Sequence, residues 1–365
     1  MALRTNRCLT LNRYGRYTLK GTGEPSVARR AADGAFSNIR VTRGGRVNVL
    51  VRRFSRLSTN VSRSSPNMKH FALLNLTCLL LFSGSALGQA TTQPIEHGLR
   101  VFIAGHSFHV PIAKPLVEVA KLAGYAEHHT PAPLFVGSSR AIQIWQVPDD
   151  KNTARQALAR GEVDVLSLTT TRQMPDPGLE RFVELALAQS RPPRVIVQQS
   201  WFSFDTERGD PDPERKQATD WNAATGATLL QKHQGYFTDF EAQIDAINRE
   251  AGHPVIFTVP SGRALIALRE RVRTGAVPGV TTQAELFTDR IGHPAPAANL
   301  LNAYCHFAVI YRRSPVGLPV PSTLDRFAPQ DREPLNRILQ EKAWESVLAH
   351  PQSGVTNPRP QPSPK

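Results

Sequence analysis

The chain has 365 residues, 40% of them hydrophobic, which is enough for one sizeable folded domain or two small ones. Its net charge of +14 is concentrated in residues 1–88, which hold 15 of the 44 basic residues and only 2 of the 30 acidic ones. The rest of the chain is close to neutral. A basic surface for phosphate contacts is therefore not expected there, and the composition predicts no nucleic-acid partner.

Residues 1–67 form a basic extension that is rich in Arg, Ser and Gly and has no sustained hydrophobic periodicity, so little order is expected. Two interpretations of this extension remain open. Met68 is the true initiator, in which case residues 1–67 are not made, or the extension is an organelle transit peptide or a cytosolic tail on a membrane anchor.

The segment MKHFALLNLTCLLLFSGSALGQA, which begins at Met68, has the order of a secretory signal peptide. A short positive start precedes an apolar run over residues 71–82, which is too short to span a bilayer comfortably, and small residues then lead to Gly88. We predict a signal peptide over residues 68–88, a secreted or periplasmic protein, and no stable membrane span after cleavage. The alternative is a buried core helix.

Short β-branched runs alternate with amphipathic helical runs beyond Gly98. Buried parallel strands are predicted over Arg100–Ala104, Val163–Leu168, Arg194–Gln198 and Val255–Val259, because these runs are nearly all apolar. Helices are predicted within 112–123, 151–161, 177–190, 238–252 and 261–275. The repeated β-α-β order predicts an α/β fold over residues 98–350: a three-layer α/β/α domain with a mostly parallel, flavodoxin-like sheet.

Two polar segments interrupt or follow this pattern. Residues 205–220 have no periodicity and contain two prolines, which predicts a surface loop or lid. Residues 351–365 are rich in proline, and we predict a disordered tail. Cys305 is the one cysteine beyond the signal peptide, so no disulfide is expected within the exported part, and its apolar helical surroundings predict a buried thiol.

Ser107 directly follows the first predicted strand, in the sequence VFIAGHSFHV. In parallel sheets reactive groups collect at the carboxyl ends of strands, so Ser107 is a candidate nucleophile; a turn or capping serine is the alternative. A nucleophilic serine needs a base and a group that orients the base. Asp289 and His293, in LFTDRIGHP, lie on one loop before a helix and supply both, although His293 could instead cap that helix.

These two elements resemble those of the SGNH (GDSL-like) hydrolases, in an exported bacterial subgroup. The segments VQQSW, VPSGRALIALRERV and YRRSPVGLP are also similar to that subgroup, and the resemblance covers residues 98–319. It implies a serine ester hydrolase with Ser107 as nucleophile, His293 as general base and then acid, and Asp289 as the orienting carboxylate. It also implies an oxyanion hole formed by the backbone N–H groups of Ser107 and Gly137.

The sequence departs from the family pattern at three places. His106 replaces the usual Asp or Asn before the serine, and the spacing from Asp289 to His293 is one residue longer than usual. The G-x-N-D block is absent, so the third oxyanion donor would have to come from Thr170 or Gln173. The resemblance implies no cofactor and, by analogy with exported relatives, an acylated carbohydrate or a small-molecule ester as substrate. A non-catalytic binding protein on the same scaffold is the alternative.

Four histidines and three tryptophans are further candidates for a site. The histidines have no demonstrable carboxylate partner, so no metal site is predicted: they are His106, His109, His128 and His129. The tryptophans line a sugar-binding cleft or pack in the core, and the sequence favours neither: they are Trp145, Trp201 and Trp221.

Overall fold

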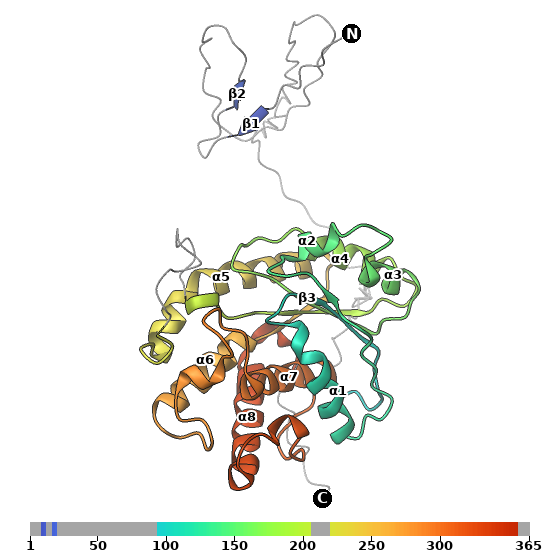
Figure 1. The fold of residues 1–365 in the computed structure, drawn as a ribbon. Helices are drawn as coiled ribbons and strands as arrows, with labels where there is room; N and C mark the ends of the chain where they lie inside the picture. The colour runs from blue at the N-terminus through green and yellow to red at the C-terminus, as the bar shows by residue number, and fades with distance from the viewer. Residues whose placement is uncertain (1–8, 12–16, 20–92, 206–219, 357–365) are drawn as a thin grey trace, which may run out of the picture. The chain divides into compact units, whose positions relative to one another are not determined.

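A computed structural model describes residues 9–11, 17–19, 93–205 and 220–356 (Figure 1). The chain divides into two compact units, residues 1–81 and 82–365. In the first unit, β1 (Leu9–Leu11) pairs antiparallel with β2 (Tyr17–Leu19). The predicted signal peptide and most of the basic extension lie outside the described residues. Within the described part of the chain, no helix has the length and apolar character needed to cross a bilayer.

The second unit is built on a five-stranded sheet. Its strands are β3 (Val101–Gly105), β4 (Leu134–Phe135), β5 (Val165–Thr169), β6 (Arg194–Gln198) and β7 (Ile256–Val259). The spatial order is β4-β3-β5-β6-β7, and every pair of neighbours is parallel. This is the order of flavodoxin-like sheets, so the predicted fold class is confirmed.

Alternate side chains of the strands supply two separate hydrophobic layers, as the period of a β-strand requires. In β3, Val101 and Ile103 belong to one layer, whereas Phe102 and Ala104 belong to the other. Because both faces are covered by helices, the strands are apolar along nearly their whole length rather than alternating between apolar and polar residues. This composition is what made four of the strands recognisable in the sequence.

Four helices cover each face of the sheet (Figure 1). One face carries α1 (Ala113–Leu122), α6 (Ser261–Arg273), α7 (Pro296–Tyr311) and α8 (Pro329–Ala349). The other carries α2 (Ala141–Trp145), α3 (Thr153–Ala159), α4 (Gly178–Leu187) and α5 (Gly226–Glu250). Helix α7 is buried on nearly all sides between α1, α6 and α8, which explains its apolar sequence and the complete burial of Cys305.

The short helices are one-turn 3-10 segments in the connections. They are η1 (Val110–Ile112), η2 (Ser203–Asp205), η3 (Gln283–Leu286), η4 (Ser322–Leu324) and η5 (Pro351–Ser353). Segment η2 follows β6 and is held by Asp205, a buried carboxylate whose two oxygens each lie 2.7 Å from a guanidinium nitrogen of Arg269 in α6. Residues 206–219 of the predicted surface loop lie outside the described part of the chain.

The structure corrects three details of the predicted elements. Helix α5 begins at Gly226, twelve residues before the predicted start, because Thr225 caps it through the backbone N–H of Thr228. The sequence analysis predicted no helix beyond the one that follows His293, but α8 follows α7 and packs along it. The tail was expected to be disordered from Pro351, yet residues 351–356 are folded. Val355 is buried in the core there, and the Gln352 amide donates to Asp245 of α5.

The topology determines where a site can form. Strand β3 lies between β4 and β5. The connection after β3 leads to β4 on one side, and the connection after β4 returns past β3 to β5 on the other side, so the strand order reverses at β3. A crevice at such a reversal of strand order is the usual binding site of open α/β sheets. Ser107 lies two residues after the end of β3.

Candidate active site

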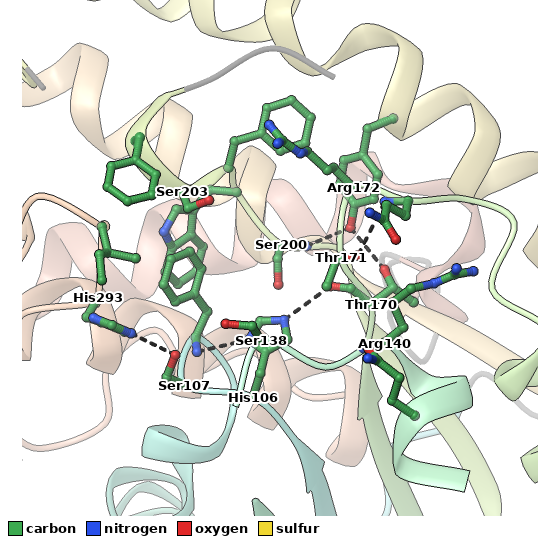
Figure 2. Close-up of a pocket in the computed structure, with 18 of the residues that line it drawn as sticks. His106, Ser107, Ser138, Arg140, Thr170, Thr171, Arg172, Ser200, Ser203 and His293 are labelled. Carbon is green, nitrogen blue, oxygen red and sulfur yellow. Dashed lines mark hydrogen bonds between the residues drawn. The ribbon is translucent and has the colours of Figure 1, made fainter. Parts of the chain in front are cut away.

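A cavity of about 700 Å³ opens beside the carboxyl ends of β3, β5 and β6 (Figure 2). Its volume is in the range of pockets that bind small ligands, about 300–1,000 Å³. Its walls come from the segments that follow the strands, together with one side chain of α5 and the loop before α7. The lining includes residues 106–108, 138–143, 170–173, 200–204, Tyr236 and 290–293 in part.

Ser107, His293 and Asp289 form one hydrogen-bonded chain at this cavity. The Ser107 Oγ lies 2.7 Å from the Nε2 of His293, and the His293 Nδ1 lies 2.6 Å from the Oδ2 of Asp289 (Figure 2 draws the first contact). An ionised carboxylate can only accept, so Nδ1 carries the proton, and Nε2 is left to accept from the Ser107 hydroxyl. The structure thus brings the three predicted site residues together, although Ser107 and His293 are 186 positions apart in the sequence.

The loop that carries Asp289 and His293 accommodates its extra residue at Gly292. This glycine has a φ of 102°, a conformation that L side chains rarely adopt. The Oδ1 of Asp289 accepts from the backbone N–H groups of Ile291 and Gly292 at 2.9 and 3.0 Å. The aspartate therefore shapes its own loop while its second oxygen orients the imidazole. The longer Asp-to-His spacing is compatible with a direct contact for this reason.

The same hydrogen bonds keep Asp289 ionised. Burial by itself raises the pKa of the Asp289 carboxyl. The side chain and backbone of His293 and the backbone of Gly292 act in the other direction, and together they hold this pKa below its ordinary value. A carboxylate that stays charged near neutral pH can both fix the tautomer of His293 and stabilise its protonated form.

His106 holds the turn that presents the serine, where the family has Asp or Asn. Its Nδ1 accepts from the backbone N–H of Phe108 at 3.2 Å, so its Nε2 carries the proton and donates to the carbonyl of Thr170 at 3.2 Å. Burial lowers the pKa of His106 to about 4, so the ring is neutral at pH 7. A neutral imidazole thus replaces the carboxylate or amide as the acceptor for this turn, and it ties the turn to β5.

Two buried amides fix the turn from the other side, and the sequence analysis did not single them out. The carbonyl of Phe108 accepts from the Nε2 of Gln198 at 3.0 Å and from the Nδ2 of Asn302 at 3.3 Å. Asn302 also donates to the Oε1 of Gln198 at 2.9 Å. The sequence did contain a signal for these two residues, because Gln198 ends an apolar strand and Asn302 lies inside the apolar helix α7, where polar residues are uncommon.

Not all of the predicted oxyanion donors lie at the cavity. Ser107 lines the cavity, and its N–H makes no hydrogen bond within the described part of the chain. Gly137 does not line the cavity; its neighbour Ser138, with a left-handed φ of 51°, does. Thr170 lines the cavity, but its hydroxyl lies 3.2 Å from the Tyr236 hydroxyl and is engaged there. Gln173 also lines the cavity and is exposed.

Of the other histidines of the sequence analysis, His109 and His128 have separate structural partners, and His129 is exposed. The Nε2 of His109 lies 2.8 Å from the Ser167 hydroxyl, and the Nδ1 of His128 lies 2.7 Å from the Tyr311 hydroxyl. A side chain at Gly105 would place its Cβ 2.4 Å from the His109 ring, so a glycine is needed at the end of β3. Within the described residues, no group of three or more His, Cys, Asp or Glu side chains could hold a metal ion.

Of the three tryptophans, Trp201 lines the cavity. Its ring is stacked on Phe108 with 5.1 Å between centroids, and its Nε1 donates to the carbonyl of Gly292 at 3.0 Å. Trp145 packs against Phe182, away from the cavity lining. Trp221 packs behind the loop of Asp289 and His293, against Phe287. Trp201 therefore connects the wall of the cavity to the histidine loop.

No family model matches the chain, and no curated protein matches its sequence. The fold is similar to several solved structures. A DUF4886 family protein from Bacteroides uniformis is 14% identical, with a TM-score of 0.44 over 70% of this chain and 96% of its own. A candidate SGNH hydrolase from Slackia heliotrinireducens is 16% identical, with a TM-score of 0.34 over 57% of this chain and 97% of its own.

A candidate GDSL-like lipase from Parabacteroides merdae is 10% identical, with a TM-score of 0.36 over 58% of this chain and 94% of its own. The likeness is one of fold. What this chain does has to be inferred from its own site.

Proposed function

We propose that the chain is a serine-dependent ester hydrolase. The observation that carries this proposal is the hydrogen-bonded chain from Ser107 through His293 to Asp289, with contacts of 2.7 and 2.6 Å, at the edge of a cavity large enough for a substrate. A serine hydroxyl within hydrogen-bond reach of an imidazole, itself oriented by a carboxylate, is the arrangement that activates serine for acyl transfer.

The reaction follows from the direction of these hydrogen bonds. Ser107 Oγ attacks the ester carbonyl while its proton passes to Nε2 of His293, and the imidazolium is stabilised by Asp289. His293 then returns the proton to the departing alcohol, which leaves an acyl group on Ser107. A water molecule then gives a proton to His293 and attacks the acyl carbonyl. The bond between Ser107 Oγ and the acyl group breaks, His293 returns the proton to Oγ, and the acid is released. The backbone N–H of Ser107 is the first proposed donor to the oxyanion, with a second donor from the loop of Gly137 and Ser138.

The first prediction is that catalysis depends on this chain of residues. Hydrolysis of p-nitrophenyl acetate by Ser107→Ala should fall on the order of 10⁴- to 10⁶-fold in kcat, and Asp289→Asn should lose about 10⁴-fold, because the imidazole then adopts the wrong tautomer. The matched control is Ser322→Ala, an exposed serine in η4, which should keep full activity.

A fluorophosphonate probe gives an independent measurement of the same prediction. It should label the wild-type protein on one serine, which peptide mass spectrometry should identify as Ser107, and it should leave Ser107→Ala unlabelled. Equal rates of ester hydrolysis in Ser107→Ala and in the wild type would contradict the assignment of the nucleophile.

We propose an acylated carbohydrate as the substrate and an exported location for the enzyme. The support for export is the order of charge, apolar run and small residues over residues 68–88. Sequencing the amino terminus of the mature protein tests it: a start near Gln89 is expected, and a start within residues 1–67 would contradict export by this signal. The substrate is tested by comparing the release of acetate from an acetylated polysaccharide with the hydrolysis of p-nitrophenyl acetate. The polysaccharide should be the better substrate.

A non-catalytic binding protein is the second candidate. The observation that favours it is that no asparagine is among the cavity-lining residues of the described chain, so the asparagine of the G-x-N-D block has no counterpart of its own kind there. The probe experiment separates the two: a binding protein would bind oligosaccharides in calorimetry and leave the probe unreacted. Labelling of Ser107 together with turnover would exclude it.

A further inference from the structure

The cavity beside Ser107 has two chemically different sides. Apolar side chains at or beside the histidine loop are Phe108, Trp201, Phe204 and Ile291, and Phe202 adds to the apolar lining from the side of α5. The remaining lining is mostly polar, and part of it comes from the β4–α2 connection and from the segment after β5. Figure 2 shows Arg140 and Arg172 on the side of the cavity away from His293, together with Thr170, and His106 lies between the two sides.

The charged groups of the lining have one sign. Arg140, Arg172 and Arg290 line the cavity, and no carboxylate does so among the residues that the structure describes. Asp289 lies beside the cavity, but its oxygens accept from His293 and from the backbone of its own loop. His106 adds no charge at neutral pH, because burial lowers its pKa to about 4. Within the described part of the chain, the charged side chains of the lining are therefore all positive, although residues 89–365 together are nearly neutral.

Arg140 is held in place by the fold. Its Nη2 donates to the carbonyl of Pro175 at 2.5 Å, and its Nε lies 3.9 Å from the Asp176 carboxylate. Asp176 is fully buried and accepts from the backbone N–H groups of Ala141 and Ile142 at the start of α2. Its charge is thus shared with the end of a helix as well as with Arg140. The Nε of Arg140 is buried beside Asp176 and Nη2 donates to Pro175, so within the described chain Nη1 is the nitrogen left to donate to a ligand.

Arg172 and Arg290 make interactions of their own, and their contribution here is their charge and their place on the lining. Arg172 comes from the segment after β5, on the same side of the cavity as Arg140 in Figure 2, and Arg290 comes from the histidine loop. Three separate segments therefore bring a guanidinium to one cavity. A planar guanidinium presents paired N–H donors, which match the two oxygens of a carboxylate or a phosphate.

We propose that the ester substrate carries an oxyanion, a carboxylate or a phosphate, which the arginine side of the cavity binds while the ester lies at Ser107. This inference rests on the proposed function, because it concerns the substrate of the same site. If the substrate is an acylated carbohydrate, the proposal requires that this carbohydrate is acidic. Acidic esters that contain no carbohydrate fit the proposal equally well. The apolar side formed with Trp201 and Phe204 then takes the uncharged part of the substrate.

Two matched pairs of esters test the proposal on the wild-type protein. The first pair is 4-nitrophenyl butyrate and mono-4-nitrophenyl succinate, which place a methyl group or a carboxylate at the end of the acyl chain. The second pair is 4-nitrophenyl acetate and 3-carboxy-4-nitrophenyl acetate, which differ by a carboxylate on the leaving group. Each kcat/KM is divided by the rate constant of the same ester with hydroxide, so that intrinsic reactivity cancels.

In at least one pair the anionic ester should be favoured by tenfold or more, on the order of one guanidinium–carboxylate contact. The ratio of anionic to neutral ester should fall toward one in Arg140→Gln and in Arg172→Gln, and it should shrink when salt is raised from 50 to 500 mM. Because a ratio is measured, a variant with less folded protein still reports correctly. Arg337→Gln, which removes an exposed charge from α8, is the matched control and should keep the wild-type ratio.

Inorganic phosphate distinguishes the two kinds of oxyanion. If the site prefers phosphate, millimolar phosphate should inhibit hydrolysis of the neutral esters competitively in the wild type and less in Arg140→Gln. If it prefers carboxylate, phosphate should inhibit weakly while succinate inhibits.

Turnover with no preference in either pair, no inhibition by either anion, and no effect of the arginine variants would overturn the proposal and leave the hydrolase in place. Absence of turnover together with an unlabelled Ser107 would instead show that the proposed function itself is wrong.

Discussion

Gly292 shows how one residue determines the distance between the imidazole and its carboxylate. Its φ of 102° lets the chain turn between Asp289 and His293, and a Cβ at this position would lie 3.0 Å from the Trp221 ring. Its carbonyl accepts from the Trp201 indole. An added methyl group therefore meets both an unfavourable backbone conformation and a tightly packed ring.

We expect Gly292→Ala to lower kcat/KM for p-nitrophenyl acetate by about tenfold or more, since strain of 1–3 kcal/mol at this position is of the size that shifts a catalytic group. Gly275→Ala is the matched control, because Gly275 also has a positive φ, 74°, but a Cβ added there would have no atom within 4 Å. Both variants should lose some thermal stability, but only Gly292→Ala should lose activity. Equal activity in the two would show that the loop tolerates a different turn.

At the scale of elements, the histidine loop depends on segment η2, which follows β6. The backbone N–H of Phe204 donates to the carbonyl of Ile291 at 3.0 Å, and the next residue is Asp205. Asp205 and Arg269 form a buried bidentate pair, with both side chains less than a tenth exposed, and Arg269 also donates to the carbonyl of Trp221 at 2.9 Å. This pair joins α6 to the part of the chain that faces the loop.

Arg269→Met should destabilise the protein by about 3–5 kcal/mol, because it leaves the Asp205 carboxylate buried without its partner. Urea unfolding of the variant and the wild type measures this loss. The control is Arg273→Met in the same helix, whose ion pair with Glu270 is exposed and should contribute at most about 1 kcal/mol. A loss in Arg269→Met no larger than in Arg273→Met would show that water or a rearranged loop compensates the carboxylate.

At the scale of the whole molecule, five buried histidines make stability depend on pH. Burial lowers the pKa of each, to about 4 in four of them and well below the ordinary value in His109. They are His106, His109, His128, His233 and His306. In the unfolded chain an imidazole has a pKa of about 6.5. Between pH 6.5 and 4 the unfolded chain therefore binds more protons, so stability falls as the pH falls through that window.

We expect the urea midpoint to be constant above about pH 7.5 and clearly lower at pH 5, with each additional proton contributing about 1.4 kcal/mol per pH unit. Carboxylates affect this comparison little: burial raises the pKa of Glu241, but hydrogen bonds from its neighbours bring it to about 2, so it titrates at lower pH. His306→Phe, which replaces one buried imidazole, should reduce the slope. An unchanged midpoint between pH 7.5 and 5 would contradict the prediction.

The alternation of strands and helices, and hence the fold class, could be predicted from the sequence because it depends on local patterns. A short run of β-branched residues such as Arg194–Gln198 predicts a buried strand, and the observed strand has the same bounds. Helix α8 and the folded residues around Val355 were missed, because their place depends on packing against α7 and on contacts with α5. Hydrophobic periodicity alone does not show such partners.

By itself the sequence determined the candidate residues Ser107, Asp289 and His293, since each stands in a short motif with a recognisable chemistry. Only the tertiary structure decided that the serine and the imidazole lie 2.7 Å apart, that Gln198 and Asn302 hold the turn between them, and that three arginines share the cavity. The physical reason is range. Backbone preferences and hydrophobic periods act over a few residues, whereas a site is formed by loops that the sheet brings together from distant parts of the chain.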